Sequence, residues 1–417
     1  MSGMAECLRL LTRLKNKRLH LGVTGSVACY KAAELLRLLL ACGIHVSATL
    51  TPAARRFVSP LLFESLGAFP VYTDMFEKAD SPFDHLEPGQ NADAFFVVPA
   101  TANTLAAMAA GLAQEMLHAQ LLAFDGPVLA APAMNPRMWM NQATQANCTA
   151  LSARGVTLVT PDSGTMACGD SGQGRLAPVP VLFLYALQAL APQDMIGQRV
   201  LVTLGPTREP WDGVRFWSNP SSGTMGACLA FAAWMRGAEV TAVTGSGVSK
   251  DLLPAGIPYL TRVDCGTAAD MYEAAAAAWP GCSMGFFAAA VADFSPVPYG
   301  SGKFKKADAK DGFSVNFTPN RDILASLAAQ RAPGQKMLGF AAETAPDMDT
   351  LLKLAGEKRQ RKGCDVIAAN IVGRKDSGFA SLTNAMAVAG PGDAGAIWEN
   401  RSKADVAWDL CSCLLNA

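Results

Sequence analysis

The stretch GPTREPWDGVRFWSNPSSGTMG, residues 205–226, joins a short apolar run, Val200–Leu204, to a helical pattern, Ala227–Arg236. An apolar run of this kind is typical of a buried parallel strand, so the stretch is predicted to connect a strand to a helix. In doubly wound proteins such connections bind ligands, and a helix start rich in serine and glycine offers backbone N–H groups to phosphate. Arg208 and Arg215 add bidentate donors for anions. The stretch therefore predicts a binding site for a phosphorylated anion rather than a plain surface loop.

The first half of the chain alternates strand-like and helical patterns. A helical pattern with apolar residues on one face, Ala28–Cys42, follows the first strand-like run. The strand candidates of this half are Leu19–Val23, Ile44–Leu50, Ala94–Val98, Val128–Ala131 and Val156–Val159. Because alternating strands and helices build a parallel sheet that is covered on both faces, this half predicts a doubly wound α/β domain.

The second half repeats this alternation after a segment that contains several prolines. Its strand candidates are Val200–Leu204, Glu239–Val243, Met284–Ala290, Met337–Ala341 and Asp365–Ala369, with helices expected at Thr224–Arg236, Thr267–Trp279, Asp322–Arg331 and the C-terminus. We place a boundary near residue 193, between a first domain of residues 1–192 and a second of residues 193–417. The predicted fold class is α/β, with two doubly wound parallel-sheet domains.

Composition narrows the possible classes of protein. The formal net charge is zero over 417 residues, which gives no electrostatic reason to expect a nucleic-acid partner. The 11 cysteines are scattered without a CxxC pair, which favours a reducing cytoplasm over a disulfide framework. Polar residues interrupt the N-terminal apolar run, and Pro280 divides the uncharged run Ala274–Ala292. Neither a signal peptide nor a membrane span is therefore expected.

Three strand ends in the first half carry loops of small, hydroxyl-bearing or amide-bearing residues. GVTGSVACYK (residues 22–31), PATANT (residues 99–104) and PAMN (residues 132–135) each follow a predicted strand, so all three are expected at one edge of the sheet. The first loop lacks the GxGxxG pattern, which argues against a nicotinamide-dependent dehydrogenase. A helix start reached through Gly25 and Ser26 suits a single phosphate, as FMN would need.

Two side chains near this edge are candidates for proton transfer. His85 lies in the polar loop FDHLEP, and imidazole groups exchange protons near neutral pH. Cys168 lies in PDSGTMACGDSGQGR, residues 161–175, a glycine-rich segment that is too polar to be a core. A cysteine in such a loop is more reactive than one inside an apolar helix, such as Cys228.

Taken together, these motifs resemble two enzyme families. GVTGSVACYK, His85, PATANT, PAMN and ACGDSGQGR resemble the flavin-dependent phosphopantothenoylcysteine decarboxylases. A second set of motifs resembles the bacterial phosphopantothenate–cysteine ligases: GPTREPWDGVRFWSNPSSGTMG, AAAVADF, GKFKK, NRDIL, GFAAET and EKRQRK. The order of the two sets is similar to that in the bifunctional bacterial enzymes of coenzyme A biosynthesis, over nearly the whole chain from Leu19 to Ala417. The resemblance implies a flavodoxin-like FMN domain followed by a Rossmann-like ligase domain.

For the first half, the resemblance implies FMN-dependent oxidative decarboxylation of phosphopantothenoylcysteine to phosphopantetheine. His85 would aid proton removal at the oxidation step, Asn135 would bind the substrate carboxylate, and Cys168 would donate a proton when the enethiolate is reduced. The loop of residues 161–175 would close over the substrate as a lid. The FMN contacts of the family correspond to Gly25, Ser26, Thr101 and either Thr49 or Thr51.

For the second half, the resemblance implies that phosphopantothenate and L-cysteine are joined at the expense of CTP through an acyl-cytidylate, with Mg²⁺ spreading the negative charge. Asn219 and Arg215 correspond to residues of the acyl-cytidylate step, and Lys303 corresponds to the lysine needed for attack by cysteine. The positions that would contact the nucleotide are Ala289, Ala290, Asp293, Lys303, Arg321, Asp322, Ile323, Leu324, Phe340, Lys358 and Lys362. The sequence identifies no metal ligands.

Two departures from the ligase pattern change the charge near the predicted phosphates. Thr224 stands where bacterial relatives usually have lysine, which removes one positive charge. Arg321 stands where proline is commoner, which places a positive charge next to the nucleotide positions. We expect Arg321 to restore part of the charge that Thr224 lacks, and both halves to be active.

Two other functions compete with this interpretation: an FMN-dependent decarboxylase of another substrate class, and a non-catalytic FMN-binding regulatory subunit. PAMN with ACGDSGQGR and the attached ligase half argue against the first. The presence of His85 and Cys168 argues against the second. The resemblance also implies a homo-oligomer, with trimeric flavin domains joined further through dimeric ligase domains.

Overall fold

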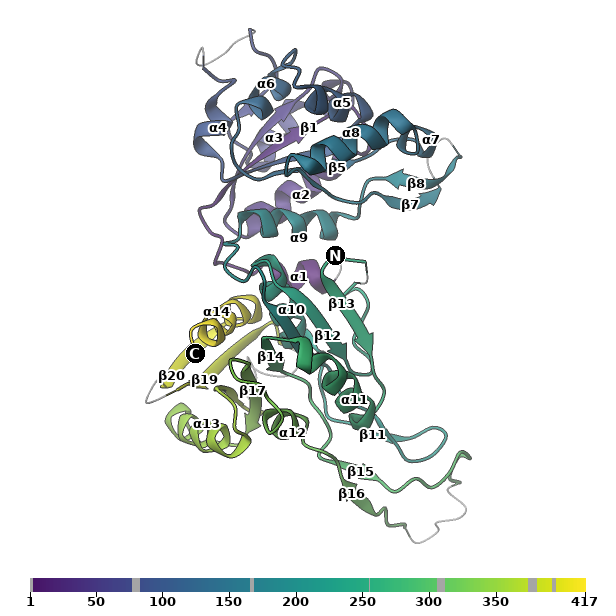
Figure 1. Ribbon diagram of the computed structural model, residues 1–417, viewed down its shortest axis with the longest axis vertical. Coiled ribbons are helices and arrows are strands. Elements are labelled where there is room, and N and C mark those ends of the chain that lie inside the picture. Colours follow the sequence, from purple (N-terminus) through teal and green to yellow (C-terminus); the bar gives the residue numbers. More distant parts are fainter. Residues whose placement is uncertain are drawn as a thin grey trace. The chain divides into compact units, whose positions relative to one another are not determined.

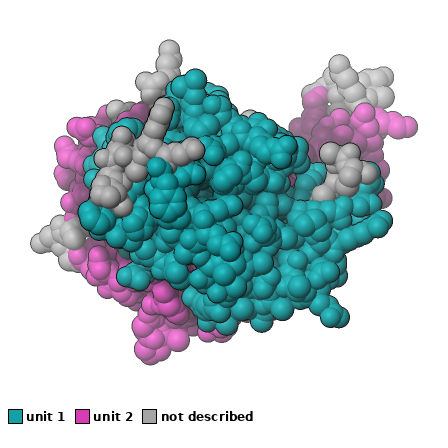
Figure 2. Space-filling model, turned by 90° about the horizontal axis from the view of Figure 1, so that it is seen from above, with its two compact units in different colours: residues 1, 12–192 teal, residues 2–11, 193–417 magenta. Residues whose placement is uncertain are grey.

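The chain forms two compact units, which Figure 2 shows in different colours. A computed structural model describes residues 3–76, 83–165, 169–254, 256–305, 312–373, 381–391 and 395–417. The first unit comprises residues 12–192, and the second comprises residues 2–11 with 193–417. The expected first domain included the N-terminal segment, but helix α1 (Gly3–Leu8) belongs to the second unit. It buries Met4 and Leu8 there, because an isolated short helix gains stability only by packing an apolar face.

The first unit is built on a six-stranded parallel sheet with the order β3-β2-β1-β4-β5-β6. Its strands are β1 (Arg18–Val23), β2 (His45–Leu50), β3 (Val71–Tyr72), β4 (Ala94–Ala100), β5 (Val128–Pro132) and β6 (Thr157–Leu158). Without the two-residue β3, the order is that of flavodoxin-like folds, and the direction of winding reverses between β1 and β4. The predicted doubly wound fold is confirmed for this half.

Helices cover the sheet of the first unit on both sides (Figure 1). They are η1 (Val27–Cys29), α2 (Tyr30–Ala41), η2 (Ala54–Arg56), α3 (Pro60–Leu66), α4 (Glu87–Asn91), α5 (Ala102–Ala110), α6 (Met116–Leu122), α7 (Pro136–Trp139), α8 (Gln142–Ala153) and α9 (Val179–Leu190). The side chains of Thr101 and Asn135 accept hydrogen bonds from backbone N–H groups in the first turns of α5 and α7, which sets where these helices begin. An antiparallel hairpin, β7 (Asp162–Thr165) and β8 (Ser171–Arg175), occupies much of the segment predicted to be a lid.

The second unit is built on an eight-stranded sheet with the order β13-β12-β9-β14-β17-β18-β19-β20. Its strands are β9 (Arg199–Leu204), β12 (Glu239–Thr244), β13 (Leu260–Asp264), β14 (Met284–Phe287), β17 (Lys336–Glu343), β18 (Val366–Ile371), β19 (Thr383–Ala389) and β20 (Gly395–Ser402). The first six are parallel and have the Rossmann order, as predicted. Two antiparallel strands, β19 and β20, extend this sheet; they were not predicted, because no helix separates them in the described part of the chain and the alternation of strands and helices ends at β18.

The helices of the second unit position the connections that leave the sheet. They are α1, α10 (Thr224–Met235), α11 (Ala268–Ala278), η3 (Trp279–Gly281), α12 (Ile323–Ala328), α13 (Met348–Lys362) and α14 (Lys403–Leu415). α10 is largely apolar and is buried at every residue except Met225, because it lies against the sheet and also contacts α1 and α14. Two short hairpins, β10 (Glu209–Pro210) with β11 (Phe216–Trp217) and β15 (Phe294–Pro296) with β16 (Phe317–Pro319), lie beyond the sheet edge (Figure 1).

Among the described residues, none of the helices is both long enough and apolar enough to cross a membrane.

Candidate active sites

The predicted anion-binding stretch of the second unit leaves the sheet where the strand order reverses, between β9 and β14. The segment that follows β14 is hydrogen-bonded to the start of this stretch. Ala288 N–H donates to Thr203 C=O at 3.0 Å, and Ala290 N–H donates to Gly205 C=O at 2.9 Å. The connections that follow β9 and β14 therefore leave the sheet side by side. This is the position at which doubly wound folds bind their ligands.

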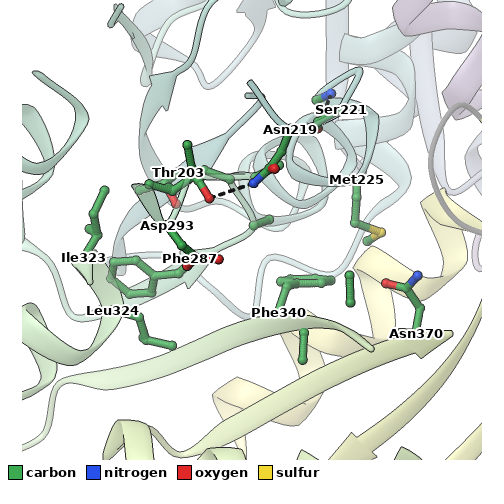
Figure 3. A pocket seen from close by; sticks show the side chains of 18 of the residues that line it. Thr203, Asn219, Ser221, Met225, Phe287, Asp293, Ile323, Leu324, Phe340 and Asn370 are labelled. Atoms are coloured by element: carbon green, nitrogen blue, oxygen red, sulfur yellow. Dashed lines mark hydrogen bonds between the residues drawn. The ribbon is translucent and has the colours of Figure 1, made fainter. Parts of the chain in front are cut away.

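A cavity of about 560 Å³ lies at this point (Figure 3). Eleven of the predicted ligase residues line it, from connections far apart in the sequence: Asn219, Ala289, Ala290, Asp293, Arg321, Asp322, Ile323, Leu324, Phe340, Lys358 and Lys362. The volume suits a ligand of nucleotide size. Nearly all of the residues that the resemblance assigned to nucleotide binding therefore line this one cavity.

Hydrogen bonds hold the polar wall of this cavity in place. The Asn219 amide donates to Val291 C=O at 2.9 Å (Figure 3), and the Asn320 amide donates to Ala292 C=O at 2.8 Å. Both bonds use carbonyl groups of the connection that follows β14. The connection after β9 and the start of α12 are thereby joined to the same backbone segment, which orders the wall before any ligand binds.

Two cationic side chains on α13, Lys358 and Lys362, also line the cavity. Lys358 Nζ donates to Glu343 at 2.9 Å, and Lys362 pairs with Asp322, whose carboxylate also accepts from Ala325 N–H at the start of α12. Burial raises the pKa of Asp322, but its pKa lies below the ordinary value because Lys362 and the Ala325 N–H lower it more. The carboxylate therefore stays ionised and holds Lys362 at the cavity.

Two predicted catalytic residues, Arg215 and Lys303, are not among those that line the cavity. Arg215 Nη1 donates to the Asp212 carboxylate at 2.6 Å and to Phe304 C=O at 3.2 Å, so the segment that contains Lys303 is bound to the loop between β10 and β11. Lys303 itself is exposed. Arg215 thus contacts the residue that follows Lys303, and neither the Arg215 nor the Lys303 side chain is among those that line the cavity.

Several lining residues were missed by the sequence reasoning. They are Thr203, Ser221, Ser222, Met225, Asn320, Asn370, Asn384 and Lys403. Ser221 and Ser222 lie inside the quoted stretch and could have been singled out as helix-start residues. Asn370 and Asn384 lie on β18 and β19, and no local sequence pattern indicates that these strands reach the cavity.

In the first unit, the ends of β1 and β4 are joined at the point where winding reverses. The Thr24 hydroxyl donates to Pro99 C=O at 2.7 Å and accepts from Thr101 N–H at 3.1 Å. A Cβ atom on Gly25 would lie 2.4 Å from Ala53 Cβ, so only glycine lets the first loop approach the segment after β2 so closely. The starts of η1 and α5 follow Ser26 and Thr101 and present N–H groups at this edge, which fits the phosphate of FMN.

The two alternatives for a threonine contact to FMN differ in the structure. Thr49 is fully buried, and its hydroxyl donates to Gln120 Oε1 at 2.6 Å while lying 2.8 Å from His20 Nε2. Thr51 accepts from Ala54 N–H and lines a small cavity of about 110 Å³ between the end of β2 and the start of α6. Thr51 is therefore the better candidate, because the Thr49 side chain points into a hydrogen-bonded core.

His85 and Asn135 lie on loops of the first unit. His85 follows Asp84, whose carbonyl accepts from the Gln120 amide at 3.2 Å, so the loop is bound to α6. Asn135 precedes α7, and its amide donates to the Asp170 carboxylate at 2.7 Å. Cys168 lies outside the described residues. Asp170, which follows it in the chain, nevertheless connects the lid hairpin to the PAMN loop.

The sequence identified no metal ligands, and no disulfide framework was expected. Within the described ranges, there is no cluster of three or more histidine, cysteine or acidic side chains suited to a metal ion. The ten cysteines in that part of the chain are unbridged.

Comparison with known proteins gives matches over both units. Residues 8–189 match the family model described as Flavoprotein, and residues 195–417 match the DNA/pantothenate metabolism flavoprotein C-terminal domain. The Coenzyme A biosynthesis bifunctional protein CoaBC of Vibrio vulnificus is 36% identical over 91% of this chain and 92% of its own length. The protein of the same name from Escherichia coli is 39% identical over 89% and 90%. A solved structure of the C-terminal domain of CoaBC is 28% identical, with a TM-score of 0.42 over 54% of this chain and 97% of that one. With relatives of this identity over nearly its whole length, the chain belongs to the family of bifunctional coenzyme A biosynthesis proteins.

Proposed function

We propose that this chain carries out two consecutive steps of coenzyme A biosynthesis. The second domain, residues 193–417, joins L-cysteine to phosphopantothenate at the expense of CTP, and the first, residues 1–192, decarboxylates the product. The observation that carries the proposal is the convergence of eleven ligase-motif residues on one cavity of about 560 Å³. Residues scattered over the sequence rarely meet in this way unless they bind a common ligand.

In the ligase site, each group has a task that its position supports. Asn219 holds the phosphopantothenate carboxylate near the α-phosphate of CTP, while Lys358 and Lys362 balance the charge of the nucleotide. Mg²⁺ enters with the triphosphate, because this ion usually binds through substrate phosphates rather than a protein cage. Arg215 and Lys303 approach when the segment that contains them closes over the cavity, and Lys303 then assists attack by the cysteine amine.

In the decarboxylase site, Gly25, Ser26, Thr51 and Thr101 would hold FMN, which would supply reversible hydride chemistry when bound. His85 takes up the proton released from the substrate thiol. The Asn135 amide, oriented by Asp170, binds the carboxylate that will leave as carbon dioxide. Cys168 supplies the last proton.

We also propose a localisation and an assembly. The unbridged cysteines of the described residues favour the reducing cytoplasm. By the family resemblance, the flavin domains assemble as trimers that dimeric ligase domains join further.

One incubation tests both activities. The full chain is mixed with phosphopantothenate, L-cysteine, MgCl₂ and CTP, and CMP and carbon dioxide are measured, with omission of each substrate as a control. Release of both products is expected. CMP without carbon dioxide contradicts the decarboxylase, and carbon dioxide from added phosphopantothenoylcysteine without any CMP contradicts the ligase. The flavin absorbance of the purified protein is measured as well, and a colourless protein contradicts FMN binding.

A further inference from the structure

Polar side chains form a continuous hydrogen-bonded chain through the core of the first unit. They come from β1, β2, α6 and the loop before α4, and in order along the chain they are Ser47, His20, Thr49, Gln120 and the backbone carbonyl of Asp84. His20, Thr49 and Gln120 are fully buried. Because a buried polar group is costly unless it has a partner, each member of this chain depends on its neighbours.

The chemistry of one end fixes the direction of every bond in this chain. The Asp84 carbonyl can only accept, so the Gln120 NH₂ group faces it at 3.2 Å, and the Gln120 oxygen faces Thr49 at 2.6 Å. The Thr49 hydroxyl donates its proton to that oxygen and therefore accepts from His20 Nε2–H at 2.8 Å. His20 Nδ1 then carries no proton and accepts from the Ser47 hydroxyl at 2.7 Å.

The state of the His20 ring agrees with this direction. Burial lowers the pKa of His20 to about 3, so at neutral pH the ring is uncharged, with one N–H and one bare nitrogen. The rings of Phe95 and Tyr72 pack beside it, with centroids 4.5 and 6.0 Å away. The chain is thus satisfied by one arrangement of protons, and the Gln120 amide is fixed with its N–H towards Asp84.

The last bond of the chain reaches the turn that carries His85. Leu86 N–H donates to Phe83 C=O at 2.7 Å, so Asp84 and His85 are the two central residues of a β-turn. The Gln120 amide therefore ties this turn to α6. Met116 and Leu117, at the start of the same helix, line the small cavity that Thr51 also lines. One helix thus connects the His85 turn with the end of β2.

We propose that Gln120 is a positioning residue of the decarboxylase, and that it sets the place of His85 by holding the turn at Asp84 against α6. The proposal rests on the proposed role of His85, which is to take up the proton of the substrate thiol. A general base works only within hydrogen-bond reach of its proton, so a small displacement of the turn slows the reaction. Thr49 and His20 act behind Gln120, because they orient its amide.

The test compares variants at two points of this chain, in the full-length protein loaded with FMN. Gln120→Met keeps the length of the side chain but cannot donate to Asp84 C=O. Ser47→Ala removes the far end of the chain and leaves the Gln120–Asp84 bond in place, so it is the matched control for lost stability. For each protein, kcat and KM for added phosphopantothenoylcysteine are measured per bound flavin. Hydrogen–deuterium exchange of residues 83–91 and urea unfolding are measured alongside.

We expect Gln120→Met to lower kcat by ~10-fold with little change in KM, because the turn loses a hydrogen bond and His85 is displaced. Amide exchange within residues 83–91 should become ~10-fold faster, the N–H of Leu86 included. Ser47→Ala should lower the free energy of unfolding but leave kcat and this exchange within about twofold of the wild type. If Ser47→Ala matches Gln120→Met in both measurements, the effect is one of general stability and the proposal is overturned.

Thr49→Val tests the same bond if Gln120→Met folds poorly, since it keeps the shape of the side chain and removes the hydroxyl that orients the Gln120 amide. The same two effects are expected at ~3-fold. In a folded variant at Gln120 or Thr49, an unchanged kcat or an unchanged exchange of residues 83–91 overturns the role of Gln120. A wild-type chain that releases no carbon dioxide contradicts the decarboxylase function itself, whereas an active wild type with unaltered variants contradicts only the role of Gln120.

Discussion

Nη1 of Arg215 lies 2.6 Å from the Asp212 carboxylate, which also accepts the backbone N–H of Phe304 at 3.0 Å. Because Phe304 directly follows Lys303, one carboxylate joins the loop between β10 and β11 to the segment that contains a predicted catalytic lysine. Burial raises the pKa of Asp212, but the N–H groups of three neighbouring residues and the Arg215 guanidinium lower it to about 2. The carboxylate is therefore ionised at any pH at which the ligase would be assayed.

Asp212→Asn should separate these two segments. Its amide cannot accept from Arg215 and Phe304 as the carboxylate does, so we expect kcat of the ligase to fall by ~10-fold, a charge-assisted hydrogen bond being worth about 1.5–3 kcal/mol. Decarboxylation of added phosphopantothenoylcysteine should be unchanged. Asp264→Asn, which alters the ion pair between the exposed Asp264 and the largely buried Arg262, is the matched control. Equal loss of both activities would show a general folding defect instead.

His20 should make the stability of the first unit depend on pH. It is fully buried, and burial lowers its pKa to about 3. The unfolded chain binds a proton near the ordinary histidine pKa of about 6.5, so stability is complete above that pH and falls as the pH drops toward 3. We expect a loss of about 2 kcal/mol between pH 7 and pH 5 from this group. Urea unfolding of wild type and His20→Leu at the two pH values checks this, since the variant should lack that part of the dependence.

Gly25→Ala should reduce flavin binding. The added Cβ would meet Ala53 Cβ at 2.4 Å, so the loop after β1 or the segment after β2 must move apart. We expect a purified protein with less flavin per chain, measured by absorbance, and a lower decarboxylase rate that added FMN partly restores. Gly356→Ala is the control, because a Cβ there meets open space on α13. Full flavin content in Gly25→Ala would count against this loop as the cofactor site.

Asp322→Ala should weaken CTP binding through Lys362. The carboxylate pairs with Lys362 and accepts from Ala325 N–H, so its loss removes a helix cap worth about 1 kcal/mol and frees the lysine from its position at the cavity. We expect KM for CTP to rise by ~10-fold with KM for cysteine unchanged. Asp347→Ala removes the equivalent cap of α13 away from the cavity and serves as the control. A rise in both KM values would point to distortion of the whole site.

Arg236→Met should destabilise the second unit more than the first. Arg236 is 2% exposed and forms two hydrogen bonds to Asp194, at 2.8 and 2.6 Å, in addition to its bonds to α14. Because Asp194 is partly exposed, the loss is smaller than for a fully buried pair, and we expect about 2–4 kcal/mol. Unfolding of each unit is monitored separately, the first unit by its flavin signal and the second by ligase activity, to measure this loss of stability. Asp194→Asn should have a smaller effect, since the bonds to α14 remain.

Local pattern was enough to predict most of both sheets. Buried parallel strands are continuous apolar runs, and Leu19–Val23 and Val200–Leu204 both lie within observed strands. The strand-end loops were also predictable, because parallel strands present their carboxyl ends at one edge. The two-residue strand β3 was not predicted, because two residues are too few to show a period, whereas β6 lies within the predicted strand Val156–Val159.

The amino-acid sequence by itself determined the alternation of strands and helices, the loops that end the strands, and the motifs that assign the chain to its family. Only the tertiary structure decided that the Thr49 side chain lies in a polar core, that α1 packs with the second unit, and that Asn384 and Lys403 share a cavity with the start of α10. The physical reason is that period and propensity act over a few neighbouring residues. Which strand ends meet, and which polar side chains join in one buried network, depends on packing between segments that are distant along the chain.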